Sequence, residues 1–475
     1  MNNQVRNKGW KLSALGVLCA ALTACGSGSA PAETGGETGA SGEIAASGGK
    51  TAVTMTVMTK NRFLEEAEAK FESAHPDIDI QIEEVVPADD TATGGKTMIR
   101  MGPGQNIGPS AEEVDQYVNA VNTAIMSGKA ADIVSAEHLP YEKYAEEGLI
   151  ADWNELADQD GAFAKSDYFE NIFDGVSIGG GWYGIPTSYT LDVMVGDASL
   201  LESSGLNDET WTWNQFIELL EKEGQTGSGK FGLSMVEPED LLADLVETVY
   251  EQLVAQDNGD AVFDGKAFQA YMENVKKLYD DGLATAEQTG PGSTNFSLVT
   301  MQMPIEVASS FTKLSGEHDA LLRPPGTGQD EGIPFKSNQV LALNANSNVK
   351  EAAWEFVKFL LSQEMQSSPG LMNFPVHREA LSVKLKEMQE MLAGGGGKGG
   401  KGLVMKGPNG ASVELTDEDI EQVLSVIPSV GKYLNKDAKV LNMIREESAA
   451  FFSGSKTAKA VADTLANRIA TYLNE

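Results

Sequence analysis

Hydrophobic positions in the first third of the chain repeat with two different periods. Every second residue is apolar in segments 52–58 and 78–82, which predicts strands, whereas segments 63–73 and 114–125 repeat apolar residues at helical spacing. The short segment Asp132-Ile133-Val134 predicts a third, buried strand. This order of strand, helix, strand, helix and strand predicts an open α/β sheet with parallel strands.

Two pairs of polar residues lie just past predicted strands of this sheet. Asn61 and Arg62 follow the first strand, and Glu137 and His138 follow the third. Open α/β sheets bind ligands beyond the carboxyl ends of their strands. We therefore predict that these four residues contact a ligand.

The stretch from Gly179 to Met194 reads GGGWYGIPTSYTLDVM. Its glycines let other groups approach the backbone closely, and the apolar run at 189–195 predicts a strand. Trp182, Tyr183 and Tyr189 would then form an aromatic binding surface where the chain crosses between two bodies. The alternative is a buried aromatic turn without a binding role.

The second half of the chain is mostly helical by pattern. Amphipathic stripes run through segments 213–220, 268–279, 352–361 and 458–472, and we interpret them as packing surfaces. Trp213 belongs to the first of these surfaces, and both Trp211 and Trp213 are interpreted as core residues. The glycine-rich segment 392–402 is interpreted as a flexible insertion.

The length and the net charge of the chain limit the folds and partners that it can have. A chain of 475 residues is too long for one hydrophobic core, so two or more lobes are expected. The formal net charge of −35 argues against nucleic acid as a partner, because phosphate binding requires basic patches.

The first residues predict export and lipid anchoring. Basic residues precede a short apolar segment that ends in Leu-Thr-Ala-Cys at Cys25, which resembles the lipobox of bacterial lipoproteins. Residues 1–24 would be the signal peptide, Cys25 would carry the lipid, and residues 25–51 would form a flexible Gly/Ser/Glu tether. An ordinary signal peptide is the alternative. Cys19 would leave with the signal peptide, so no disulfide is expected in the exported part.

Several short segments match catalytic motifs in residue type and spacing but not in the secondary structure that the motifs require. Gly179, Gly181 and Gly184 match a dinucleotide fingerprint, and residues 175–179 match a nucleophile elbow, but neither is followed by the helix that the motif requires. We predict no metal site and no cofactor. Paired carboxylates leave a secreted glycan hydrolase open as the alternative, since 70 acidic residues guarantee pairs somewhere.

A series of sequence motifs, in the same order along the chain, resembles the sequences of family 1 extracellular solute-binding proteins of ABC importers over residues 52–475. The motifs are PDIDIQIEEV, SGKAADIV, YAEEGLIADW, YGIP, ETWTWNQF, AFQAYMENVKKLYDDG, VKEAAWEFVKFLLSQEMQ, FPVHREAL and the last 25 residues. The resemblance implies the two-lobe periplasmic-binding-protein-like fold, in which each lobe is an α/β sheet flanked by helices and the ligand cleft lies between the lobes.

The resemblance also implies where the chain crosses between lobes. The three crossings are expected near residues 185–191, 303–311 and 373–377. Lobe 1 would then contain residues 52–187 and 308–372, and lobe 2 would contain residues 188–307 and 373–475. Phe311, Asn373 and Phe374 become candidate ligand contacts, although the family often has tryptophan where this chain has Phe311.

Aromatic rings, carboxylates and amides together suit a carbohydrate, which has apolar C–H faces and a rim of hydroxyls. We expect a monomeric, non-catalytic receptor that is lipid-anchored on the outer face of the bacterial cytoplasmic membrane. It would close on its sugar and deliver it to the ABC permease. Peptides, polyamines and other polar solutes stay open, as does a surface adhesin that binds a polymer without closing.

Overall fold

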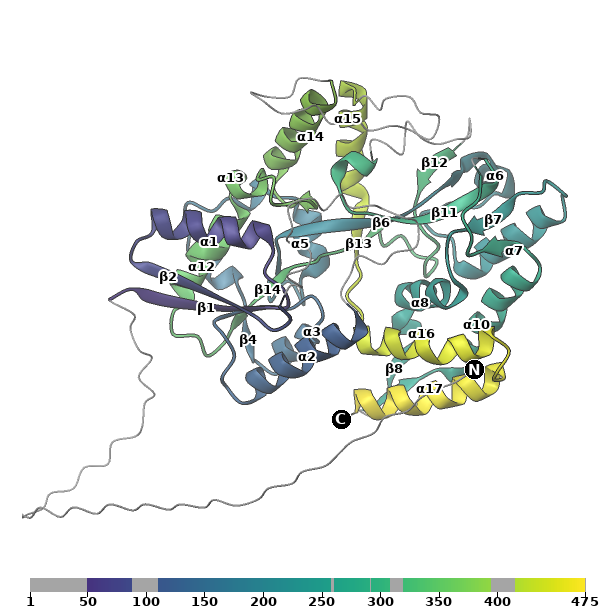
Figure 1. Ribbon diagram of the computed structural model, residues 1–475, viewed down its shortest axis with the longest axis horizontal. Helices are drawn as coiled ribbons and strands as arrows, with labels where there is room; N and C mark the ends of the chain where they lie inside the picture. The colour runs from purple at the N-terminus through teal and green to yellow at the C-terminus, as the bar shows by residue number, and fades with distance from the viewer. Residues whose placement is uncertain are drawn as a thin grey trace, which may run out of the picture. The chain divides into compact units, whose positions relative to one another are not determined.

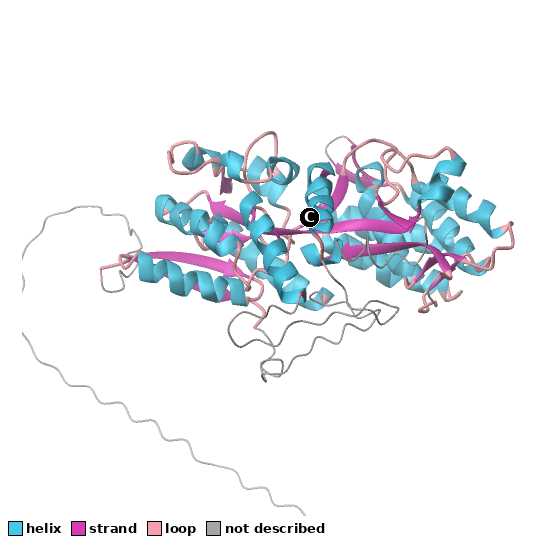
Figure 2. Cartoon of the chain, turned by 90° about the horizontal axis from the view of Figure 1, so that it is seen from above, coloured by secondary structure: helices cyan, strands magenta, loops and turns pink. Residues whose placement is uncertain are grey.

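The computed structural model describes residues 49–87, 110–257, 260–290, 292–307, 319–393 and 415–474. Two mixed sheets dominate these residues, and helices flank the strands of both (Figures 1 and 2). We call the first sheet with the helices packed on it the first lobe, and the second sheet with its helices the second lobe. The prediction of a two-lobe α/β fold is confirmed.

The first sheet has the strand order β2-β1-β3-β14-β4, and β5 pairs with β14. β1 is parallel to β2 and to β3, as the sequence predicts, whereas β14 is antiparallel to β3, β4 and β5. The strands are β1 (Thr51–Val57), β2 (Ile78–Glu84), β3 (Ile133–Ser135), β4 (Ile150–Ala151), β5 (Ile185–Pro186) and β14 (Val340–Asn344).

The second sheet has the strand order β10-β7-β11-β6-β13-β16, and β12 and β15 also pair with β6. β6 (Ser188–Asp197) is the long strand that enters this lobe from β5. The other strands are β7 (Phe231–Ser234), β10 (Ala284–Thr285), β11 (Thr294–Met301), β12 (Asp319–Leu322), β13 (Ile333–Lys336), β15 (Phe374–Pro375) and β16 (Val430–Tyr433). A separate hairpin joins β8 (Val254–Asp257) to β9 (Asp260–Phe263).

Helices of the two lobes follow the amphipathic patterns of the sequence. Those before the first crossing are α1 (Arg62–Ala74), α2 (Ala111–Met126), α3 (Tyr141–Glu146), α4 (Asn154–Ala157) and α5 (Glu170–Val176). The next are α6 (Ala198–Ser204), α7 (Trp213–Gly224), α8 (Pro238–Thr248), α9 (Tyr250–Leu253) and α10 (Gly265–Asp280). The last are α12 (Lys350–Leu361), α13 (Gln363–Gln366), α14 (Arg378–Leu392), α15 (Asp417–Val426), α16 (Ala438–Phe452) and α17 (Ala458–Leu473).

Apolar side chains form two cores. The first core joins the first sheet to α1, α12, α14 and α15, and it extends to Tyr189 and Phe335 at the start of the second sheet. The second core joins α7, α8, α10, α16 and α17. Trp211 and Trp213 are 2% and 3% exposed, so their interpretation as core residues is confirmed. Among the described residues, no helix is both long and apolar enough to cross a bilayer.

Strand pairing moves the predicted lobe boundaries. β12 and β13 pair with β6, so the chain stays in the second sheet through Lys336, and the expected start of the returning segment at residue 308 is wrong. The chain returns to the first sheet only at β14. Apolar residues of α14 and α15 belong to the first core, so residues 373–475 are also divided between the lobes. Packing of these helices, which sequence spacing does not encode, determines the division.

The first crossing lies at Thr187, between β5 and β6, within the predicted range. The returning segment touches it directly, because Thr187 N donates to Gln339 O at 3.0 Å and Ser337 Oγ donates to Ser188 O at 2.7 Å. Gln366 is fully buried, and its side chain forms hydrogen bonds with residues of both the first and the third crossing. Its Nε2 donates to Thr187 O at 3.0 Å and its Oε1 accepts from Val376 N at 2.9 Å.

Candidate functional site

Glu137 lies two residues past the end of β3, as the sequence predicts, and it faces the returning segment. Its carboxylate accepts from Ser135 Oγ at 2.7 Å and from Val340 N at 3.3 Å. Burial raises the pKa of Glu137 to about 7, although these two hydrogen bonds favour the charged form. The carboxyl group therefore titrates near neutral pH at the edge of the first lobe.

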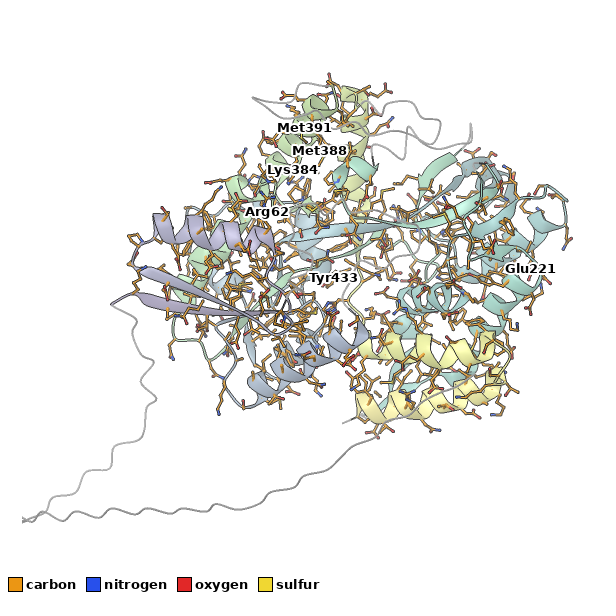
Figure 3. The ribbon with its side chains drawn as sticks, in the orientation of Figure 1. Arg62, Glu221, Lys384, Met388, Met391 and Tyr433 are labelled. Carbon is orange, nitrogen blue, oxygen red and sulfur yellow. The ribbon has the colours of Figure 1, made fainter. Side chains whose placement is uncertain are left out.

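His138 is half-buried beside Glu137, and burial lowers the pKa of its imidazole to about 4. The ring is therefore neutral at pH 7 and able both to donate and to accept hydrogen bonds. Tyr433, labelled in Figure 3, ends β16 and packs against Phe335 with ring centroids 5.2 Å apart. Burial raises the pKa of Tyr433, and carboxylates from both lobes add to the shift, among them Glu137 and Glu247. Tyr433 thus lies where the two lobes meet.

Trp182 is 9% exposed and packs inside the first lobe, which differs from the expected open platform. Its ring lies 4.8 Å from that of Phe173 and 6.4 Å from that of Phe163, measured between centroids. Lys165 Nζ lies 4.5 Å from the ring centroid. The buried aromatic turn, which was the alternative interpretation, matches this environment better. Neighbouring Tyr183 is half-buried.

Tyr189 and Phe374 come together at the start of the second sheet, but both are fully buried. Their rings stack with centroids 5.3 Å apart, and β15 pairs with β6 at these two residues. The Tyr189 hydroxyl has no hydrogen-bond partner within the described part of the chain. Asn373 is half-buried, and its Nδ2 donates to Gln302 O at 3.1 Å. The predicted ligand contacts Tyr189, Asn373 and Phe374 therefore lie together at the crossings. Tyr189 and Phe374 are core residues.

The remaining predicted site residues divide between the surface and the undescribed segments. Asn61 and Arg62 are exposed, and Asn61 caps α1 by accepting from Leu64 N at 2.9 Å. Phe311 and Cys25 lie outside the described residues. Asn61 thus has a structural role that the sequence prediction did not include.

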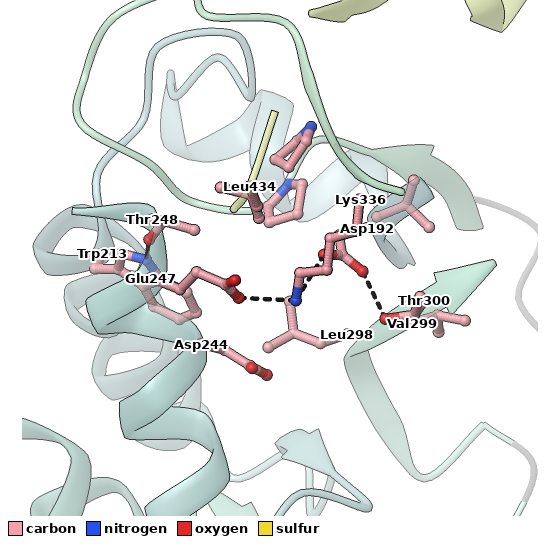
Figure 4. A pocket seen from close by; sticks show the side chains of 13 residues that line it. Asp192, Trp213, Asp244, Glu247, Thr248, Leu298, Val299, Thr300, Lys336 and Leu434 are labelled. Carbon is pink, nitrogen blue, oxygen red and sulfur yellow. Dashed lines mark hydrogen bonds and ion pairs between the residues drawn. The ribbon is translucent and has the colours of Figure 1, made fainter. Parts of the chain in front are cut away.

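A cavity of about 100 Å³ opens between β6, β11 and β13 on one side and α8 on the other (Figure 4). We call it the acidic cavity, because three carboxylates line it and Lys336 is the cation among its lining residues. The lining residues are Asp192, Val193, Trp213, Asp244, Glu247, Thr248, Leu298, Val299, Thr300, Pro324, Pro334, Lys336 and Leu434. Leu434 follows Tyr433, so the cavity lies next to the meeting of the two lobes.

Lys336 bridges two of the three carboxylates. Its Nζ lies 2.8 Å from Glu247 Oε2 and 3.3 Å from Asp192 Oδ2. Thr300 Oγ1 also donates to Asp192 at 2.5 Å. Burial works against the charge on Lys336, but Asp192, Glu247 and Asp244 outweigh it and raise the pKa of the ammonium group. Lys336 therefore stays charged and holds Asp192 and Glu247 in fixed positions.

Asp244 is the third carboxylate, and Figure 4 shows its side chain directed into the acidic cavity. Within the described part of the chain, no hydrogen bond or ion pair reaches its carboxylate. Burial raises the pKa of Asp244 to about 7, the Lys336 charge opposes this shift, and Glu247 and Asp192 add to it. The cavity therefore offers a solute one free carboxyl group and two fixed ones.

The sequence prediction missed the residues of this cavity. Asp192 interrupts the apolar run of β6, and Asp244 and Glu247 interrupt the apolar second half of α8 about one turn apart. Acidic residues inside apolar elements are rarely buried unless they are paired, so they are a signal of a polar site. The sequence cannot show that β6, β13 and α8 bring these residues together.

Comparison with known proteins links this geometry to a family. The family model of bacterial extracellular solute-binding proteins matches residues 100–367, which is more than half of the chain. No curated protein gives a significant match.

Solved structures share the fold at low sequence identity. The family 1 extracellular solute-binding protein of Alicyclobacillus acidocaldarius is 18% identical with a TM-score of 0.51, and the alignment covers 90% of this chain and 99% of that one. The sugar-binding protein MalE of Xanthomonas citri is 14% identical with a TM-score of 0.53, over 89% and 97% of the two chains. The cyclic alpha-maltosyl-1,6-maltose binding protein of Arthrobacter globiformis is 13% identical with a TM-score of 0.50, over 90% and 100%.

Proposed function

Because the chain belongs to the family of bacterial extracellular solute-binding proteins, we propose that it captures a carbohydrate outside the cell and delivers it to an ABC permease. This membership confirms the resemblance to family 1 solute-binding proteins of ABC importers that the sequence motifs indicate. The family binds solutes without catalysing a reaction, so the chain is not an enzyme. The glycan hydrolase alternative is therefore set aside.

The acidic cavity is the observation that carries the proposal. Its carboxylates and the oxygen of the Thr300 hydroxyl offer hydrogen-bond acceptors for hydroxyl groups, and Leu298 and Val299 offer apolar surface for C–H groups. Such a combination suits a polyhydroxylated solute. The names of the Xanthomonas and Arthrobacter proteins, which are a sugar-binding protein and a binder of a cyclic maltosyl-maltose, support the same class of ligand.

Closure of the two lobes would complete the site. Glu137 and His138 belong to the first lobe, the acidic cavity belongs to the second, and Tyr433 lies where the lobes meet. A ligand that contacts both parts favours the closed arrangement, because it binds that state more tightly. The crossing segments at Thr187, Gln339 and Val376 would then act as the hinge.

A thermal melting screen tests the carbohydrate proposal. A ligand at a hundredfold excess over its Kd stabilises the folded state by about 2.7 kcal/mol, which raises the melting temperature by a few degrees. We expect a mono- or oligosaccharide to produce this shift and amino acids and peptides to leave the melting temperature unchanged. A shift with peptides alone would contradict a carbohydrate ligand and leave the receptor role in place.

Lipid anchoring through Cys25 is the second part of the proposed function. The Leu-Thr-Ala-Cys sequence after a short apolar segment supports it, and two acyl chains make a stable anchor. We expect Cys25→Ala to release the protein into the medium or to leave it uncleaved, as fractionation and mass measurement would show. Cys19→Ala is the matched control and should leave membrane retention unchanged. Retention of the Cys25→Ala protein at the native level would contradict the lipoprotein proposal.

A further inference from the structure

We infer that the acidic cavity selects a solute bearing a protonated amine, so that the carbohydrate of the proposed function is an amino sugar rather than a neutral one. This inference rests on the proposed function and specifies its ligand. It starts from a charge imbalance, because three carboxylates and one ammonium group line the acidic cavity. The ammonium of Lys336 is bound by Asp192 and Glu247, which leaves Asp244 without a partner in the described chain.

Neighbouring cations are bound elsewhere. Arg445 Nε pairs with Asp240 at 3.2 Å, one turn of α8 before Asp244. Lys432 Nζ pairs with Glu331 at 2.8 Å and donates to Thr248 O at 2.8 Å. Both side chains are therefore paired with other carboxylates, and in the described chain neither forms an ion pair with Asp244.

An ammonium group fits this position better than a hydroxyl. A hydroxyl would donate one hydrogen bond and leave the excess negative charge in place. An ammonium group would donate up to three hydrogen bonds and compensate the third carboxylate, as charge-assisted bonds do. Glu247 is 7% exposed, so part of this interaction lies away from water, where it is stronger than at a surface.

The size of the acidic cavity indicates which part of the solute enters it. A water-sized group needs about 10–15 Å³ of this kind of cavity volume, so about 100 Å³ has room for a primary amine with its adjoining carbons. The rest of the sugar would then extend toward Tyr433 and the first lobe, where Glu137 and His138 lie. The net charge of −35 also attracts a cationic solute toward the protein at long range.

Titration of Asp244 links ligand binding to pH. Burial raises its pKa to about 7, and the charged groups that act on it are Lys336 from β13, Asp192 from β6, Glu247 from α8 and Arg445 from α16. Tyr279 of α10 also lies within electrostatic range of it. An ammonium ligand requires the ionised carboxylate, so its affinity should increase from about pH 5.5 to about pH 7, whereas the affinity of a neutral sugar should stay nearly constant.

Calorimetry with a matched pair of disaccharides tests the inference. The probes are the β-1,4-linked disaccharide of glucosamine and its N-acetylated counterpart, which has the same skeleton without the charge. We expect the aminated probe to bind at least tenfold more tightly near pH 7, where Asp244 ionises. Asp244→Asn should remove that preference without lowering the unliganded melting temperature, since the amide avoids the cost of a buried charge. Glu239→Gln, on the same helix but outside the lining of the acidic cavity, is the matched control and should keep the preference.

The outcomes distinguish this inference from the proposed function. Equal binding of the two disaccharides, or tighter binding of the N-acetylated one, would overturn the amine inference and leave the carbohydrate receptor intact. An unchanged preference in Asp244→Asn would also overturn it. Binding of spermidine without either disaccharide would support the amine site and overturn the carbohydrate proposal.

Discussion

Trp182→Ala should lower the free energy of unfolding of the unliganded protein by about 3–5 kcal/mol, the usual cost of truncating a large buried aromatic side chain. Trp182 is 9% exposed and packs on Phe163 and Phe173, so its removal leaves a cavity in the first lobe. Urea unfolding monitored by circular dichroism measures this loss in the free energy of unfolding. Met126→Ala is the control, because Met126 is 69% exposed and should change stability very little.

The same experiment separates a structural role from a binding role. A platform for a sugar ring would lose ligand affinity on substitution and keep its unliganded stability. An unchanged unfolding midpoint together with tenfold weaker sugar binding would therefore contradict the buried role that the structure indicates for Trp182. Trp182→Phe should recover part of the lost stability, because its smaller aromatic ring refills part of the site.

Gln366→Leu should lower the free energy of unfolding by about 2–5 kcal/mol, because it leaves buried polar groups without partners. The affected groups are the carbonyls of Thr187 and Leu360 and the N–H of Val376, all bonded by the Gln366 amide. Leucine has nearly the same volume, so the loss reports the hydrogen bonds rather than a cavity. Unfolding in urea measures it, and Gln363→Leu on the exposed side of the same short helix is the matched control.

A second measurement on Gln366→Leu concerns the hinge. Because Gln366 joins the first and third crossings, its loss should broaden the range of lobe arrangements in the unliganded protein. Solution scattering should then show a larger radius of gyration than for Gln363→Leu. Equal stability and equal scattering of the two variants would contradict the role of Gln366 at the crossings.

Local pattern was sufficient to predict the parallel half of the first sheet. Alternation predicts β1 and β2, and helical spacing predicts α1 and α2, because each of these elements has one apolar face that its own sequence displays. The position of β14 in the sheet could not be predicted from local pattern. Its residues are buried in an antiparallel position between β3 and β4, and nothing in Val340–Asn344 specifies those partners.

Site residues whose position depends on the order of strands could be predicted from the sequence. Residues whose position depends on how distant elements pack together could not. Glu137 and His138 come within three residues of the end of β3, so the rule for open sheets places them at the edge of the first lobe. Trp182 has the composition of a ligand platform, and only its contacts with Phe163 and Phe173 show that it is core. Asp244 lies in α8, and only the approach of that helix to β6 and β13 turns it into part of a cavity.

The position of β14 has a consequence for how the chain acquires its structure. A chain made from its amino end can pair β1 with β2 and β3 early, but the neighbouring edge of β3 stays open until Val340–Asn344 is available. An open strand edge readily pairs with other chains, and pairing between segments so distant in sequence slows folding. The second sheet is made largely from residues that lie inside this interval. The first lobe therefore cannot complete its sheet before most of the second has been synthesised.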